Sequence, residues 1–113
     1  MEAFGFTDRL DEGRPRRALA RITLLPRHLG GRDLAGGFGY RPNHNFGAPE
    51  DRAFYIGQIE VPAEGLQAGE SGVMRVTFLS GPGLDDVLRP GRRWRIQEGP
   101  RCVANGEVLE VEP

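Results

Sequence analysis

The chain has 113 residues, the size of one domain, and it is 38% hydrophobic and 27% charged with a net charge of −1. This composition excludes a disordered tail, and the lack of any apolar run near the roughly 20 residues that a bilayer helix needs excludes a helical membrane protein. The 17 glycines and 9 prolines argue against long helices, because both residue types destabilise helix interiors. Short strands joined by turns are therefore expected.

The first half of the chain begins with a segment that shows no sustained periodicity. Met1–Arg17 carries acidic residues and lacks an apolar stretch, so we expect an arm rather than a secretory signal. Leu19–Leu25 alternates apolar and polar residues, which predicts a strand that Pro26 ends. The glycine-rich segment Gly30–Gly39 predicts a mobile loop with positive φ angles, and Asn43–Phe46 predicts a short strand.

The second half of the chain contains the clearest strand patterns. Ala53–Val61 and Val73–Leu79 predict two strands, and Arg92–Gln97 predicts a third because its apolar residues alternate with polar ones. Between them, Asp85–Leu88 fits either one short helical turn or an acidic connection. Arg101–Val111 predicts the last strand.

Asn105-Gly106, inside this last segment, has two interpretations. The dipeptide is typical of a type I′ hairpin turn, but it also fits a bulge or a close-packing point in one long strand. Only four residues separate Pro100 from Asn105, so we favour the long strand. The strands together predict an all-β protein: a small closed six-stranded antiparallel β-barrel over residues 18–113, preceded by the arm 1–17. A β-sandwich is the alternative.

The arginines gather in two segments, and all 15 basic residues of the chain are arginine. Residues 9–32 carry seven arginines against two acids, and residues 89–101 carry five arginines against one acid. If the two segments meet on one face of the barrel, they form an anion-binding patch. The alternative is a solvated surface on which arginine and glutamate pair across strands.

Three motifs follow one another in a recognisable order. The segment Arg21–Leu25 precedes Gly30-Gly31-Arg32 and, six residues later, Gly39-Tyr40-Arg41-Pro42. The second motif is Ile56-Gly57-Gln58-Ile59-Glu60-Val61-Pro62. The third is Trp94–Gly106, which contains the turn Glu98-Gly99-Pro100-Arg101. From about Ala18 to the C-terminus, this order and spacing resemble the C-terminal β-barrel of translation elongation factor Tu. The resemblance implies a six-stranded antiparallel barrel.

The same resemblance implies candidate contact residues for RNA. In that family the Gly-Gly-Arg loop and the turn between the last two strands contact the T-stem of tRNA. Arg32 matches the first motif, and Glu98, Gly99 and Arg101 match the second. We add Arg41 as a candidate anion-binding residue. Glycines let the backbone approach a phosphate, and guanidinium groups bind it through two hydrogen bonds.

A protein partner is the other expectation that the resemblance raises, because the family's barrel packs on a second barrel and on a GTPase domain. This chain has no Gly-x4-Gly-Lys-[Ser/Thr] loop and no lysine, so we expect no GTP binding. Asp33 places a negative charge beside Arg32, and Pro100 replaces a glycine of the turn. These differences favour a non-catalytic protein-interaction module, with an RNA- or tRNA-binding module as the alternative. A face suited to packing also favours weak self-association.

The remaining reactive residue types do not form a catalytic pattern. His28 and His44 lack metal-ligand spacing to cysteines or acids, so we expect surface or hydrogen-bonded histidines and no metal. Cys102 is the single cysteine and cannot form a disulfide within the chain, so we expect a reduced, cytoplasmic setting. We expect Cys102 itself to be buried as a small apolar residue. Trp94 alternates with Ile96 and is predicted to lie in the core. We therefore predict no enzyme, no cofactor and no membrane partner.

Overall fold

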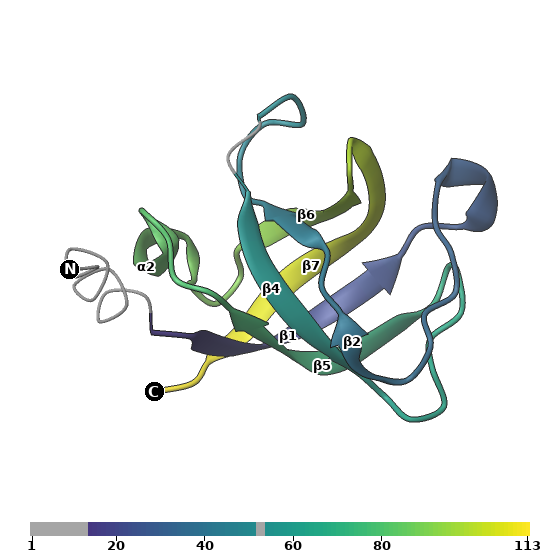
Figure 1. The fold of residues 1–113 in the computed structure, drawn as a ribbon, viewed down its shortest axis with the longest axis horizontal. Coiled ribbons are helices and arrows are strands. Elements are labelled where there is room, and N and C mark those ends of the chain that lie inside the picture. Colours follow the sequence, from purple (N-terminus) through teal and green to yellow (C-terminus); the bar gives the residue numbers. More distant parts are fainter. Residues whose placement is uncertain (1–13, 52–53) are drawn as a thin grey trace, which may run out of the picture.

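The alternating segments form seven strands, which the computed structural model describes over residues 14–51 and 54–113 (Figure 1). The strands are β1 (Arg16–Leu24), β2 (Gly37–Tyr40), β3 (Asn43–Asn45), β4 (Tyr55–Val61), β5 (Ser71–Phe78), β6 (Arg93–Glu98) and β7 (Arg101–Val111). Two short helices connect them: η1 (Arg27–Leu29) and α2 (Leu84–Val87). Asp85–Leu88 thus contributes to a helical turn, the first of its two interpretations.

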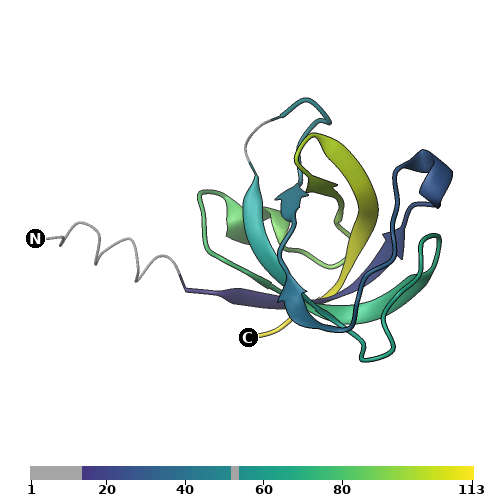
Figure 2. The same ribbon diagram turned by 45° about the vertical axis from the view of Figure 1, so that its right-hand side comes forward.

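Six of these strands close into an antiparallel ring. Their order around the ring is β4, β3, β6, β7, β1 and β5, and the pairing of β5 with β4 completes it. Strand β2 lies outside the ring and is paired with β4. Figure 2 shows the strands curving around a common interior. The predicted six-stranded antiparallel barrel is confirmed, and the sandwich alternative is wrong. A closed ring suits so short a chain because it leaves no unpaired strand edge.

The chain enters and leaves the barrel at the same place. Ala18 pairs with Val111, and the backbone N–H of Glu112 donates to the carbonyl of Arg17 at 2.9 Å. Strand β1 begins at Arg16, so the last two residues of the predicted arm belong to the barrel. Residues 1–13 of that arm lie outside the described residues. The described part of the chain has no helix whose length and hydropathy would let it span a bilayer.

The core lies inside the ring, where the long strands β1, β4, β5 and β7 bury alternate side chains over most of their length. The burial pattern of β1 alternates along its length, and Ala18, Ala20 and Ile22 are fully buried there. Trp94 is 3% exposed, which confirms its predicted place in the core. The largest fully buried hydrophobic side chains come from five strands and from α2: Phe78, Ile22, Leu24, Ile59, Leu84, Ile96, Val76, Val103 and Val108.

A buried histidine sits at the centre of the aromatic part of this core. The indole N–H of Trp94 donates to Nδ1 of His44 at 3.0 Å, and Nε2 of His44 is 3.1 Å from the carbonyl of Gly57. Because an indole N–H can only donate, Nδ1 accepts and Nε2 carries the proton. The ring of Phe78 meets the imidazole edge-on at 4.9 Å. Burial lowers the pKa of His44 to about 4, although the hydrogen bond to Gly57 opposes this, so the ring is neutral at pH 7. His44 is the hydrogen-bonded histidine that was expected.

Two glycines make room for these rings. A Cβ atom on Gly57 would lie 2.8 Å from Nε2 of His44, and one on Gly106 would lie 2.5 Å from the indole of Trp94. Strand β7 runs unbroken through Asn105 and Gly106, so the interpretation as one long strand with a close-packing point is confirmed. The hairpin interpretation is wrong. The register shifts of β7 fall elsewhere, opposite Leu19/Ala20 and Ile96/Gln97.

Two local expectations need correction. The segment Gly30–Gly39 has positive φ at Gly30 and Gly37, as predicted, but it is held to the barrel rather than left as a free loop. Its residues 37–39 belong to β2, and Leu34 forms a two-hydrogen-bond bridge with Leu66. Cys102 is half-buried instead of buried, and its thiol donates to the carbonyl of Ala104 at 3.4 Å.

Candidate functional site

The structure brings the two predicted contact segments together at one end of the barrel. Strands β1 and β7 are neighbours, and their pairing continues past β1, where the N–H of Leu25 donates to the carbonyl of Val103 at 2.9 Å. The chain then turns back over the start of β7, so that Gly30 lies against the carbonyl of Cys102. The Gly-Gly-Arg loop and the turn between β6 and β7 are therefore in contact.

Both glycines of this loop are required by the backbone. Gly30 follows η1 with φ +109°, in the left-handed region that other residues rarely adopt. A Cβ atom on Gly31 would lie 1.6 Å from the carbonyl oxygen of Leu25. The motif thus has a structural cause: the glycines let the chain fold tightly against β1 and β7, and this fold places Arg32.

Arg32, Tyr40, Glu98 and Arg101 form one group, which we call the Glu98 cluster. Nε of Arg32 donates to one carboxylate oxygen of Glu98 at 2.8 Å, and the hydroxyl of Tyr40 donates to the same oxygen at 2.6 Å. A guanidinium nitrogen of Arg101 lies 3.5 Å from the other oxygen. The guanidinium of Arg32 also lies over the Tyr40 ring, 5.1 Å from its centroid. One acid therefore contacts both predicted arginines, holding Arg32 by a hydrogen bond and pairing weakly with the exposed Arg101.

The electrostatics of the cluster keep Glu98 ionised. Its partial burial raises the pKa of the carboxyl, but the hydrogen bonds from Tyr40 and Arg32 and the charges of both arginines outweigh this, and the pKa falls below its usual value. Burial and the hydrogen bond to Glu98 raise the pKa of Tyr40. Near neutral pH the cluster thus has a neutral phenol, a carboxylate and two guanidinium groups.

Asp33 does not compete for Arg32, although it follows it in the sequence. One carboxylate oxygen of Asp33 pairs with Arg27 at 2.5 Å, and the other accepts the N–H of Ala68 at 2.9 Å. These two hydrogen bonds lower the pKa of Asp33, with the backbone N–H contributing most. Arg32 instead donates to the backbone carbonyl of Asp33 at 3.1 Å. The negative charge expected beside Arg32 is therefore directed away and neutralised by Arg27.

The other two predicted site residues, Arg41 and Gly99, line a shallow hollow of about 310 Å³ beside the cluster. Arg41 is exposed and makes no hydrogen bond or ion pair with any other described residue. Gly99 has φ +59°, and no atom lies within 4 Å of where its Cβ would be. The glycine is needed for the turn, so its presence alone does not indicate a ligand.

Tyr40 has a role that sequence reasoning missed. Its ring is half-buried beneath Arg32, and its hydroxyl is bound to Glu98. The signal was present, because an aromatic residue beside the two arginine-bearing loops can bridge them. Its acceptor could not be named without the pairing of β6 with β7.

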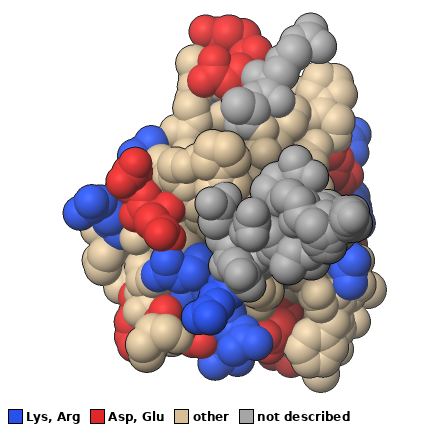
Figure 3. Space-filling view, turned by 60° about the vertical axis from the view of Figure 1, so that its left-hand side comes forward, with Lys and Arg blue, Asp and Glu red and all other residues tan. Residues whose placement is uncertain are grey.

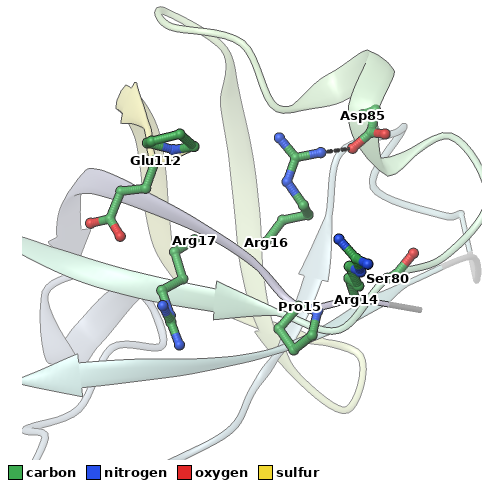
Figure 4. Close-up of a pocket in the computed structure, with 8 residues that line it drawn as sticks. Arg14, Pro15, Arg16, Arg17, Ser80, Asp85 and Glu112 are labelled. Atoms are coloured by element: carbon green, nitrogen blue, oxygen red, sulfur yellow. Dashed lines mark hydrogen bonds and ion pairs between the residues drawn. The ribbon is translucent and has the colours of Figure 1, made fainter. Parts of the chain in front are cut away.

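A second hollow, of about 450 Å³, lies where β1 begins, and its lining includes Arg14, Arg16, Arg17, Asp85 and Glu112. Figure 4 shows the guanidinium of Arg16 pointing at Asp85, while the Arg17 side chain points away from both. Figure 3 views the side of the molecule on which the chain starts and shows arginines flanked by acidic side chains. Basic and acidic groups thus alternate here, as on a solvated surface.

No three histidine, cysteine, aspartate or glutamate side chains in the part of the chain that the structure describes are grouped so that they could hold a metal ion. Asp85 and Asp86 sit in the exposed first turn of α2. A comparison with protein-family models gives no match, and a comparison with curated proteins gives no significant match.

Proposed function

We propose that this protein is a non-catalytic protein-interaction module whose contact surface is the Glu98 cluster with Arg41. The observation that carries the proposal is that Glu98 fixes Arg32 and Tyr40 through short hydrogen bonds and lies beside Arg101. Tyrosine and arginine side chains are enriched at the centres of protein interfaces, and fixing them before binding reduces the entropy lost on association. A shallow polar surface suits a protein partner better than a small substrate, which needs a deep pocket.

The chemistry of the surface indicates the kind of partner. Arg32, Arg41 and Arg101 carry three positive charges against the one negative charge of Glu98, a local balance of +2. Since Arg41 has no acidic partner among the described residues, we expect the bound protein to present a carboxylate to it. The resemblance to the C-terminal barrel of elongation factor Tu also supports the proposal, because that barrel works by docking on other domains.

The test is a capture experiment from native lysate with the full chain as bait. We expect the captured protein to survive RNase and to fall about tenfold with Arg41→Ala, the loss typical of one interface arginine. Arg89→Ala is the control, because Arg89 is also exposed and its guanidinium donates to the carbonyl of Asp86 in α2, outside the Glu98 cluster. Release of all captured material by RNase would contradict the proposal.

RNA binding at the same surface is the second candidate, and the local balance of +2 favours it. Glu98→Gln separates the two functions. On an RNA-binding surface, this change frees Arg32 and Arg101 for phosphates, so affinity for RNA should rise and its salt dependence should become steeper. On a protein-binding surface, the same change removes the group that orients both arginines, so affinity for the partner should fall. Isothermal titration at two salt concentrations measures both effects.

A further inference from the structure

A second basic surface lies on the outer face of β1, β7 and β6, and no residue of it belongs to the Glu98 cluster. Strand register aligns its side chains in two rows. Arg21, Glu107 and Arg93 face one another across the three strands in the first row. Thr23, Asn105 and Arg95 do so in the second row. All six line a groove of about 520 Å³, which we call the arginine groove.

The arginines of this groove are only partly neutralised. Arg21 lies 3.6 Å from Glu107, and both side chains are substantially exposed, so this pair is weak. The side chain of Arg93 is exposed and makes no hydrogen bond or ion pair with any other described residue. Arg95 donates one N–H to the carbonyl of Gly47 at 2.8 Å and keeps its other donors. Three guanidinium groups against one carboxylate give the groove a charge of +2.

The floor of the groove is rigid and offers no apolar side-chain pocket. It consists of Trp94 and Gly106, whose close packing fixes β6 against β7. Residues two apart on a strand are about 6.6 Å apart, and neighbouring strands are about 4.8 Å apart. The backbones of Arg93 and Arg95 are thus about 6.6 Å apart, and that of Arg21 is two strands, about 10 Å, from that of Arg93. Glu107 lies between Arg21 and Arg93 in the first row, and Asn105 lies between Thr23 and Arg95 in the second. Such a surface can receive several anionic groups at once.

We propose that the arginine groove binds the phosphodiester backbone of single-stranded RNA without reading its sequence. Guanidinium groups bind phosphate oxygens in pairs, and several of them in fixed rows match a chain that carries one phosphate per nucleotide. An acidic peptide would need pockets for its other side chains, which this floor lacks. The groove contains no exposed aromatic ring for stacking, so base identity contributes little to binding.

Fluorescence anisotropy with a labelled oligouridine of about 20 nucleotides tests the proposal on the full chain. Three phosphate contacts predict a slope of log K against log salt of about −2. Each arginine removed should make this slope less negative by about 0.7. Arg93→Gln with Arg95→Gln should therefore weaken binding at low salt by about tenfold or more and leave a slope near −0.7. Glu107→Gln should tighten binding, because it removes the acid between Arg21 and Arg93.

The controls separate this groove from the Glu98 cluster and from a general attraction to anions. Arg89→Gln removes one exposed charge near α2 and should leave the slope unchanged within the error of the measurement. Arg41→Gln removes one charge beside the Glu98 cluster and tests that surface as the site of RNA binding instead. Unchanged thermal unfolding of the variants shows that they fold. A slope near zero, equal losses from the Arg41 and Arg93 variants, or equally tight binding of polyglutamate of the same charge would each overturn the proposal.

Discussion

Replacing Gly106 by alanine should lower the free energy of unfolding by about 3 kcal/mol, the upper end of the usual cost of overpacking a core. The added Cβ would lie 2.5–2.7 Å from three atoms of the Trp94 indole, which is closer than any relaxed contact. The indole cannot easily move aside, because its N–H is bound to His44 and its ring is stacked on Phe46 at 5.1 Å. Chemical denaturation followed by circular dichroism measures the change, because a fluorescence signal would depend on Trp94, the single tryptophan of the chain.

The structure offers a matched control and a rescue for this prediction. Gly39 has no atom within 4 Å of its Cβ position, so Gly39→Ala should change stability by less than about 0.5 kcal/mol. Trp94→Phe removes the indole atoms that the new methyl group would meet. Adding Trp94→Phe should therefore cost less in the Gly106→Ala background than in the native chain. Additive losses in the double mutant would show that the proposed clash is not the cause.

Lowering the pH from 7 to 4 should destabilise the barrel by about 3 kcal/mol through His44 alone. The folded state holds the pKa of His44 at about 4, whereas an unfolded histidine has its ordinary value near 6.5. Between these values the unfolded chain binds the additional proton, so stability is full above about pH 6.5 and declines as the pH falls towards 4. Protonation would also destroy the acceptor that Nδ1 offers to Trp94.

Direct titration by NMR checks this prediction, because the chain has only two histidines. The ring signals of His44 should keep their neutral positions down to about pH 5. Unfolding curves for the native chain and for His44→Gln should then differ in their pH dependence between 6.5 and 4. The lowered pKa values of Asp33 and Glu98 also cost stability as the pH falls, from about pH 5 downward, but both variants share this loss, so it cancels in the comparison. A His44 signal that titrates near pH 6.5 in the folded protein would contradict the prediction.

Much of the barrel could be predicted because its strands are buried on one face only. Alternation along β1, β5 and β6 reports directly which side chains face the core. The pattern fails at β2, Gly37–Tyr40, because two of its four residues are glycines and its Phe38 side chain is exposed, so apolar and polar residues do not alternate. It also fails at the start of β1, where Arg16 and Arg17 pair with β5 although their side chains are charged.

The candidate site was predictable in its membership but not in its contacts. The motif order placed Arg32 and Arg101 on neighbouring loops, and the structure agrees. The acid that binds these two arginines could not be predicted, because it depends on the residue at which β6 ends. Strand β6 ends at Glu98, and this places the carboxylate between Arg32 and Arg101. The direction of the Asp33 carboxylate depended on the bridge between Leu34 and Leu66, which brings the N–H of Ala68 within reach. Contacts set by such long-range pairing leave no local sequence pattern.

The backbone hydrogen bond between Arg17 and Glu112 has a practical consequence for protein engineering. Because the chain enters and leaves the barrel through adjacent hydrogen-bonded positions, the whole barrel can be spliced into a surface loop of a host protein without stretching either strand. For the same reason, a short linker between these positions would permit a circular permutant, opened at the exposed turn around Gly91.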